Sequence, residues 1–168
     1  MLIEAIKLTL FPAMMAFAAS SDLFTMTIAN RVSLILLGGF VLLAVMTGMS
    51  TTDMLEHAGV ALAVLVVTFA FFTRGWIGGG DAKLAAVTAL WLGVSHLADY
   101  AIYASLLGGA LTLGLVQYRA MPMPRMLAGL EWAERLHRSD TGVPYGIALA
   151  AAALLVYPQT EWMTALTA

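Results

Sequence analysis

Six long apolar stretches, separated by short polar segments, dominate this sequence. They cover residues 2–20, 32–49, 55–72, 82–94, 97–116 and 146–166. Only 11% of the chain is charged, whereas soluble domains carry about a quarter of charged residues. A transmembrane helix needs about 20 mostly apolar residues, and fewer where the flanking side chains reach the membrane surface. The sequence therefore predicts an all-α integral membrane protein, a bundle of about six transmembrane helices.

The length of 168 residues favours one membrane-embedded domain, residues 1–168, with no room for a second sizeable one. A net charge of −2 without a basic stripe argues against nucleic-acid partners. The chain has no cysteine, which excludes disulfides, thiol catalysis and thiolate metal sites. The composition does not indicate an oligomeric state.

The first apolar stretch also resembles a signal peptide, because it ends in small residues that are typical of a cleavage site. However, Glu4 precedes Lys7, the only basic residue of the stretch, and the apolar run is long. We therefore expect the stretch to be retained as a span.

The distribution of Lys and Arg predicts the orientation, since these residues concentrate in cytoplasmic loops. The loops after the first, third and fifth spans hold Arg31, Arg74, Lys83, Arg119, Arg125, Arg135 and Arg138. The opposite side holds Lys7 alone. The sequence thus predicts a multi-pass protein of the inner (cytoplasmic) membrane, with the odd-numbered loops in the cytoplasm and both termini outside.

The longest cytoplasmic loop, residues 117–145, contains the segment RMLAGLEWAERLHR. Its charged residues recur at helical spacing and face away from leucines and a tryptophan, which predicts a helix lying along the membrane interface before the last span. The alternative is a lid or a substrate-docking element. Five aromatic residues near the span ends are interpreted as interfacial anchors: Trp76, Trp91, Tyr100, Tyr157 and Trp162.

Two of the ten acidic residues lie neither in the long solvated loop nor on the outer side, and Asp22 also fits a solvated interfacial residue or a helix cap beside Ser20 and Ser21. Asp22 and Asp81 each lie at the cytoplasmic boundary of a predicted span. Asp81 alone fits a helix N-cap, whose carboxylate accepts backbone N–H bonds. An N-cap does not require the preceding Gly78-Gly79-Gly80, which let backbone approach a neighbouring helix or an extended peptide closely.

Two carboxylates that meet in a site of low dielectric constant cannot easily both ionise. One then keeps its proton and acts as an acid, while the other activates water as a base. Asp22 and Asp81 are therefore candidates for this aspartic-protease chemistry, which needs no metal. Spacing in the sequence alone does not establish that they meet, or which one is the acid.

Three motifs together resemble the type IV prepilin peptidases, which are membrane aspartic proteases. Gly78-Gly79-Gly80-Asp81 is similar to the family's GxGD motif, and Asp22 followed by Ile28-Ala29-Asn30 is similar to its first aspartate with a following Ile-Pro-Asn. Val143-Pro144-Tyr145-Gly146 resembles the Pro-Tyr-Gly that opens the family's last helix. The motifs occur in the family's order and span nearly the whole chain.

Two features differ from the family pattern. Ala29 stands where the family usually has proline, which loosens the backbone but removes no reactive group. The extra cytoplasmic region with paired cysteines, which supports N-methylation in long members, has no counterpart here. The chain therefore resembles the short peptidase-only form that serves Flp-type (tight-adherence) pili. Archaeal preflagellin peptidases are another short branch with the same aspartates.

The resemblance implies an endopeptidase that removes the leader of a pilin or pilin-like precursor at the cytoplasmic membrane face, without cofactor or metal. Asp22 and Asp81 would be catalytic. Gly78, Gly79 and Gly80 would admit the extended substrate, while Lys83 and Asn30 would orient loops. Besides this precursor, membrane lipid is the expected partner.

Other classes remain open from the residues alone. Asp22 and Asp81 are also compatible with a small ion or solute transporter, although the halves show no inverted repeat and neither acid lies in mid-span. A presenilin-like protease would have a Tyr-Asp pair in an earlier helix, and none precedes Gly78. The three histidines are scattered without the spacing of metal ligands.

Overall fold

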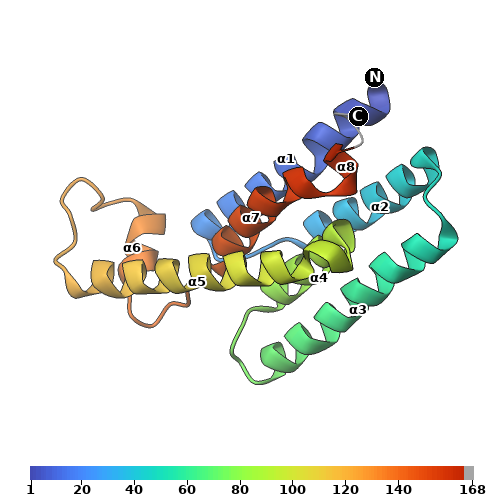
Figure 1. Ribbon diagram of the computed structural model, residues 1–168. Helices are drawn as coiled ribbons and strands as arrows, with labels where there is room; N and C mark the ends of the chain where they lie inside the picture. The colour runs from blue at the N-terminus through green and yellow to red at the C-terminus, as the bar shows by residue number, and fades with distance from the viewer. Residues whose placement is uncertain (165–168) are drawn as a thin grey trace.

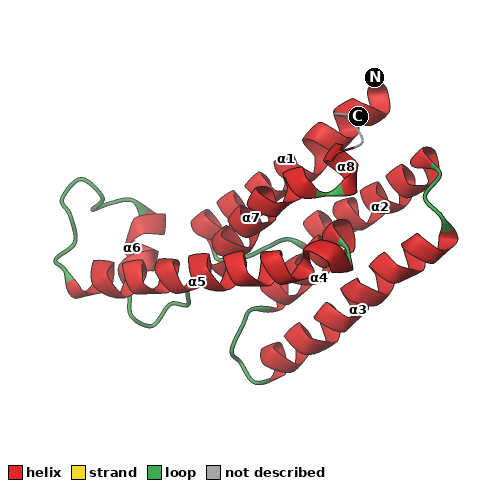
Figure 2. Ribbon diagram, in the orientation of Figure 1, coloured by secondary structure: helices red, strands yellow, loops and turns green. Residues whose placement is uncertain are grey.

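The computed structural model describes residues 1–164 and is helical throughout this part of the chain, without strands (Figure 2). Eight α-helices and two short 3₁₀ turns follow one another: α1 (Leu2–Thr25), α2 (Asn30–Thr47), α3 (Thr51–Thr73), α4 (Gly79–Leu92), η1 (Val94–His96), α5 (Leu97–Ala120), α6 (Glu131–His137), α7 (Tyr145–Val156), η2 (Tyr157–Gln159) and α8 (Glu161–Thr164).

The helices form a bundle in which neighbours in space are not always neighbours in sequence (Figure 1). The first long helix, α1, packs against α7 near the end of the chain, and α7 also packs along α5. Helix α4 lies among α2, α3 and α7. Because α1 and α7 run in opposite directions, the C-terminal end of α1 meets the N-terminal end of α7.

Within residues 1–164, four helical segments are long and apolar enough to cross a membrane: Ile3–Thr25, Asn30–Thr47, Thr51–Thr73 and Val94–Ala120. They match the first, second, third and fifth expected spans, with α1 extending five residues beyond residue 20 and α5 four beyond residue 116. The fourth and sixth expected spans are the shorter helices α4 and α7. The all-helical membrane fold is thus confirmed, whereas a count of six spans is not.

Helix α4 is the buried centre of the bundle rather than a full span. Its 14 residues reach about 21 Å at 1.5 Å per residue, less than the roughly 30 Å of a bilayer core. Every residue from Leu84 to Leu92 is buried, as expected for a helix that is apolar on all sides. It ends at Leu92 because Gly93 follows with a φ of 68°, a left-handed conformation that glycine adopts without strain.

The expected last span, residues 146–166, is interrupted. Helix α7 ends at Val156, a 3₁₀ turn follows, and α8 begins at Glu161. Pro158 explains the break, because it lacks the N–H needed for the helical hydrogen bond. Residues 165 and 166 lie outside the described part of the chain.

The interfacial helix expected within residues 125–138 is shorter than predicted. Only Glu131–His137 is helical, and the segment before it forms turns. Gly129 adopts a φ of 91°, so a helix that began at Arg125 could not continue through it. The Gly129 N–H donates a hydrogen bond to Glu134 Oε1 at 2.8 Å. This contact starts α6 at Glu131.

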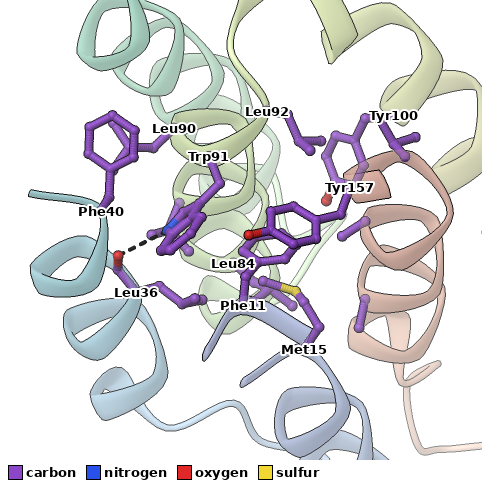
Figure 3. Packing of buried hydrophobic residues seen from close by; sticks show 14 of the residues in the cluster. Phe11, Met15, Leu36, Phe40, Leu84, Leu90, Trp91, Leu92, Tyr100 and Tyr157 are labelled. Carbon is purple, nitrogen blue, oxygen red and sulfur yellow. Dashed lines mark hydrogen bonds between the residues drawn. The ribbon is translucent and has the colours of Figure 1, made fainter. Parts of the chain in front are cut away.

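Aromatic side chains fill the core where the C-terminal end of α4 meets α1, α2 and the segment after α7 (Figure 3). The ring of Trp91 lies 5.2 Å from that of Phe11 and 5.5 Å from that of Trp162, and its indole N–H donates to the Leu36 carbonyl at 2.9 Å. Interfacial anchoring was therefore the wrong interpretation for Trp91 and for three more aromatic residues that are almost fully buried: Tyr100, Tyr157 and Trp162.

We predict that Trp91→Ala lowers the free energy of unfolding by about 3 kcal/mol, because it opens a large cavity and removes the bond to Leu36. Thermal unfolding in detergent, followed by circular dichroism, measures the effect. Trp76→Ala is the matched control, since Trp76 is 64% exposed and its removal should change stability by less than about 0.5 kcal/mol. Equal losses from both variants would contradict the assignment of Trp91 to the core.

Candidate active site

Asp22 lies in the last turn of α1, inside the helix rather than beyond its end as expected. It is 5% exposed, and its Oδ2 accepts the Gly146 N–H at 2.7 Å. Its own backbone carbonyl accepts the N–H of Met26 at 2.8 Å, where α1 ends in a left-handed residue with a φ of 55°. The side chain and the backbone of Asp22 thus fix the α1–α7 junction and the end of α1.

Gly146 occupies a position where a larger residue does not fit. A Cβ atom there would lie 2.8 Å from Asp22 Oδ2 and 2.7 Å from Ile28 Cδ1. Because the backbone of α7 begins this close to the carboxylate, its N–H reaches Asp22 directly. The sequence placed Gly146 in a motif, but periodicity and composition gave no sign of this contact.

Asp81 is the third residue of α4, not its N-cap. The N-cap is Gly78, and its backbone N–H donates to Asp81 Oδ2 at 3.1 Å. An acidic side chain that reaches back to the N-cap in this way is the second half of a capping box. The helix begins two residues earlier than the expected cap because Gly79 and Gly80 adopt helical conformation.

The carboxyl group of Asp81 has an unusual proton affinity. Burial and, to a smaller extent, the charge of Asp22 together raise the pKa of Asp81 to about 6, while the N–H of Gly78 acts in the opposite direction. The structure therefore brings Asp22 and Asp81, 59 positions apart in the sequence, to the same end of the bundle and into electrostatic interaction.

Ile28 connects the two halves of this region. It lies in the short α1–α2 connection, its Cδ1 packs against Gly146, and its Cβ lies 3.0 Å from where a Cβ of Gly80 would be. A Cβ at Gly79 would lie 3.2 Å from the ring of Phe72. The glycines before Asp81 thus contact this chain's own residues, and a role in admitting a peptide stays a prediction.

The two residues expected to support the site contact each other. The ammonium group of Lys83 on α4 donates to the side-chain oxygen of Asn30 at 2.8 Å. Asn30 is the first residue of α2. This exposed bond joins the N-terminal ends of α2 and α4 on either side of Ile28.

Sequence reasoning used Arg119 only to orient the protein, but its side chain organises the approach to α7. The guanidinium at the end of α5 donates to the carbonyls of Leu136 at 2.8 Å, Thr141 at 3.1 Å and Gly142 at 2.8 Å. These bonds fold residues 136–142 back toward the start of α7 and so help to position Gly146. A single arginine in a charged loop gives no signal of this role.

Helix α6 closes this end of the molecule. The Arg135 guanidinium donates to the Phe24 carbonyl at 2.6 Å, and the ring of Trp132 stands edge-on to that of Phe24 at 6.0 Å. Both contacts lie two residues beyond Asp22. The helix therefore covers the end of α1 instead of lying apart from the site.

A cavity of about 570 Å³ opens beside Asp81 between α3 and α5. Asp81 is its single charged lining residue, and the other lining residues are mainly apolar, among them Val67, Ile77, Ala104 and Leu149. Among the described residues, no group of three or more His, Asp or Glu side chains is placed to hold a metal ion. The site thus combines two interacting carboxyl groups with an adjoining apolar space.

A model of the type IV leader peptidase family matches residues 9–113, more than half of the chain and a range that includes both aspartates. The chain belongs to this family. Membership implies a peptidase of the prepilin type that acts on pilin precursors, and with the apolar helices it indicates an integral membrane protein. A search of curated proteins and a search of solved structures returned no match.

We predict that Gly146→Ala in this leader peptidase destabilises the fold and displaces Asp22, because the added methyl overlaps its carboxylate and Ile28. Unfolding in detergent should show a loss of about 1–3 kcal/mol. The matched control is Gly109→Ala on α5, where nothing lies within 4 Å of an added Cβ. That variant should be neutral or slightly stabilising; a similar loss there would contradict the packing argument.

A second prediction concerns pH. Asp81 holds its proton to about pH 6 in the folded protein, whereas an ordinary Asp releases it near 3.8. Unfolding then releases a proton between these values, so stability is greatest below about pH 4 and falls as pH rises toward 6. Asp81→Asn should flatten this slope in thermal unfolding measurements.

The control for the pH experiment is Asp140→Asn. Arg138 lowers the pKa of exposed Asp140, which therefore titrates below this window. Its replacement should leave the slope between pH 4 and 6 unchanged. An unaltered slope in Asp81→Asn would show that Asp81 does not carry the proton.

Proposed function

We propose that this chain is an aspartic endopeptidase that removes the leader of a pilin-like precursor, with Asp22 and Asp81 activating the attacking water. The observation that carries the proposal is the electrostatic interaction of two acidic residues from separate helices at one end of the bundle. Family membership supports peptidase chemistry over the transporter alternative.

The surroundings of the two groups assign different starting roles. Asp22 is nearly inaccessible, and its Oδ2 accepts a short hydrogen bond from the Gly146 N–H, which fixes the carboxyl group in place. Asp81 has a pKa of about 6, so it is the partner that more readily keeps a proton. In this proposal Asp22 begins as the base and Asp81 as the acid, and the two titrate as a coupled pair.

The proposed reaction proceeds through proton transfers at the two carboxyl groups. Asp22 removes a proton from water as its oxygen bonds to the scissile carbonyl carbon, and Asp81 donates a hydrogen bond to the developing oxyanion. When the C–N bond breaks, the proton held by Asp22 passes to the leaving amine. The products are a leader with a free carboxyl group and a mature chain with a free amino group.

The apolar cavity beside Asp81 supports a membrane-embedded substrate segment in this scheme. Its lining by α3 and α5 residues suits an apolar stretch of the precursor next to the scissile bond. The glycines of the GGGD segment would guide the extended part of the peptide, and Lys83 bonded to Asn30 would hold the helix ends that flank it.

The orientation and the product are part of the same proposal. The aspartates lie at the end that carries Arg31, Arg74 and Arg119, which places cleavage at the cytoplasmic face under the charge rule. With no cysteine-bearing insert, we expect no N-methyltransferase activity and a precursor of the Flp type.

We predict that Asp22→Asn and Asp81→Asn each reduce precursor cleavage by at least about a hundredfold, since each removes a group that must transfer or hold a proton. Co-expression with a pilin precursor in membranes, followed by immunoblotting, should show the full-length form accumulating. Asp53→Asn, an exposed acid at the opposite end, is the control and should cleave normally. Normal cleavage by either aspartate variant would refute the dyad, provided the proteins insert equally.

A further inference from the structure

The end of the bundle opposite the aspartates contains a second polar cavity, of about 300 Å³. It lies where α1 begins, α2 ends, α3 begins and α4 ends. Lys7, His57 and Trp162 form part of its wall, and Asp53, Glu56 and Glu161 also line it. None of these residues takes part in the proposed cleavage.

Lys7 is the unusual member of this cavity. It is only 9% exposed, and among the described residues its ammonium group has no hydrogen bond and no ion pair. The face of Trp162 lies near it, with the ring centre 6.0 Å from Nζ, and Glu4 on the same helix interacts with it electrostatically. The face of an aromatic ring attracts the ammonium charge, but it has no oxygen or nitrogen atom to accept hydrogen bonds from the three N–H groups. A buried cation in this state calls for an anion in the cavity.

The cavity wall around Lys7 is rigid. The Tyr157 hydroxyl donates to the backbone carbonyl of Lys7 at 2.8 Å, and the Trp162 indole N–H donates to the carbonyl of Trp91 at 2.8 Å. His57 Nδ1 lies 2.6 Å from the Leu90 carbonyl. Because its neighbours are held by bonds to backbone, the ammonium group cannot readily be withdrawn from the cavity.

The acids of the cavity restrict which anion fits. Asp53, Glu56 and Glu161 are exposed, and none forms an ion pair within the described residues. They would repel a ligand that carries only negative charge. A ligand that carries both a phosphate for Lys7 and an ammonium group for these carboxylates matches the positive and the negative groups of the cavity.

The position of the cavity points to a lipid as the source of that ligand. Four candidate spans begin or end beside it, at Ile3, Thr47, Thr51 and Val94, which is the level of the headgroups in a bilayer. We propose that this cavity binds the phosphoethanolamine headgroup of a membrane lipid, with Lys7 on the phosphate and the three carboxylates on the ammonium group. This inference is independent of the peptidase mechanism.

The test uses the purified full chain with phosphatidylethanolamine, phosphatidylglycerol or phosphatidylcholine of identical acyl chains. Native mass spectrometry measures lipid occupancy, and thermal unfolding measures stabilisation. Wild-type protein should prefer phosphatidylethanolamine. Lys7→Met should weaken its binding about tenfold, the size of one charge-assisted hydrogen bond. Lys83→Met, at the aspartate end and bonded to Asn30, is the matched control and should bind normally.

A second variant tests the carboxylates without touching Lys7. Asp53→Asn combined with Glu56→Gln and Glu161→Gln should remove the repulsion and shift the preference toward phosphatidylglycerol. Circular dichroism and size-exclusion chromatography establish that each variant is folded, so the result does not depend on cleavage activity.

Four outcomes would overturn the proposal. These are undiminished phosphatidylethanolamine binding by folded Lys7→Met, a wild-type preference for phosphatidylglycerol, equal binding of phosphatidylcholine, or an unchanged preference in the triple variant. Free phosphoethanolamine is the last arm of the experiment. Binding of this soluble compound as tightly as the lipid would show that the ligand is not a membrane headgroup.

Discussion

The hydrogen bond from the Gly146 N–H to Asp22 is the contact on which the arrangement of this end of the bundle depends. It joins residues 124 positions apart, inside a region where water does not compete. Only a residue without a side chain brings α7 this close to α1. Because α7 lies this close to α1, Ile28 is packed between the start of α4 and the start of α7. The hydrogen bond between Gly146 and Asp22 therefore also helps to set the position of Asp81 relative to Asp22.

The short central helix α4 explains how a charged site can exist at the edge of so apolar a bundle. A full-length span would carry its N-terminus to the membrane surface, where water screens a carboxylate. Helix α4 is shorter and buried on all sides. Its buried part runs from Leu84 to Leu92, and the partial burial of Asp81 in the turn before it raises the pKa of that carboxyl group. The capping contact from Gly78 holds the carboxyl group in place without neutralising it.

The sequence predicted the helical class from its apolar runs and drew attention to Asp22 and Asp81 as acids at the ends of those runs. Lys83 and Asn30 were named through the family resemblance, and the roles of all four residues stay predictions. It could not predict which helices touch. The bond of Asp22 to Gly146, the bonds of Arg119 and the burial of Trp91 all join distant segments, and no local pattern encodes them. The break at Pro158 was missed for another reason. The proline is a local sign of a helix end, but the long apolar run around it was read as one continuous span.

The two ends of the molecule treat buried charge in opposite ways, and this contrast argues for two separate functions. At one end, two acids lie close together, and a proton on Asp81 relieves their repulsion. At the other, the ammonium group of Lys7 has no hydrogen bond and no ion pair among the described residues and lies near a tryptophan face. The anion proposed for this cavity would offset the cost of burying that charge. A proton can be transferred during a reaction, so the end with the two aspartates suits catalysis. A counter-ion bound at Lys7 would remain in place, so that end suits a permanently bound ligand.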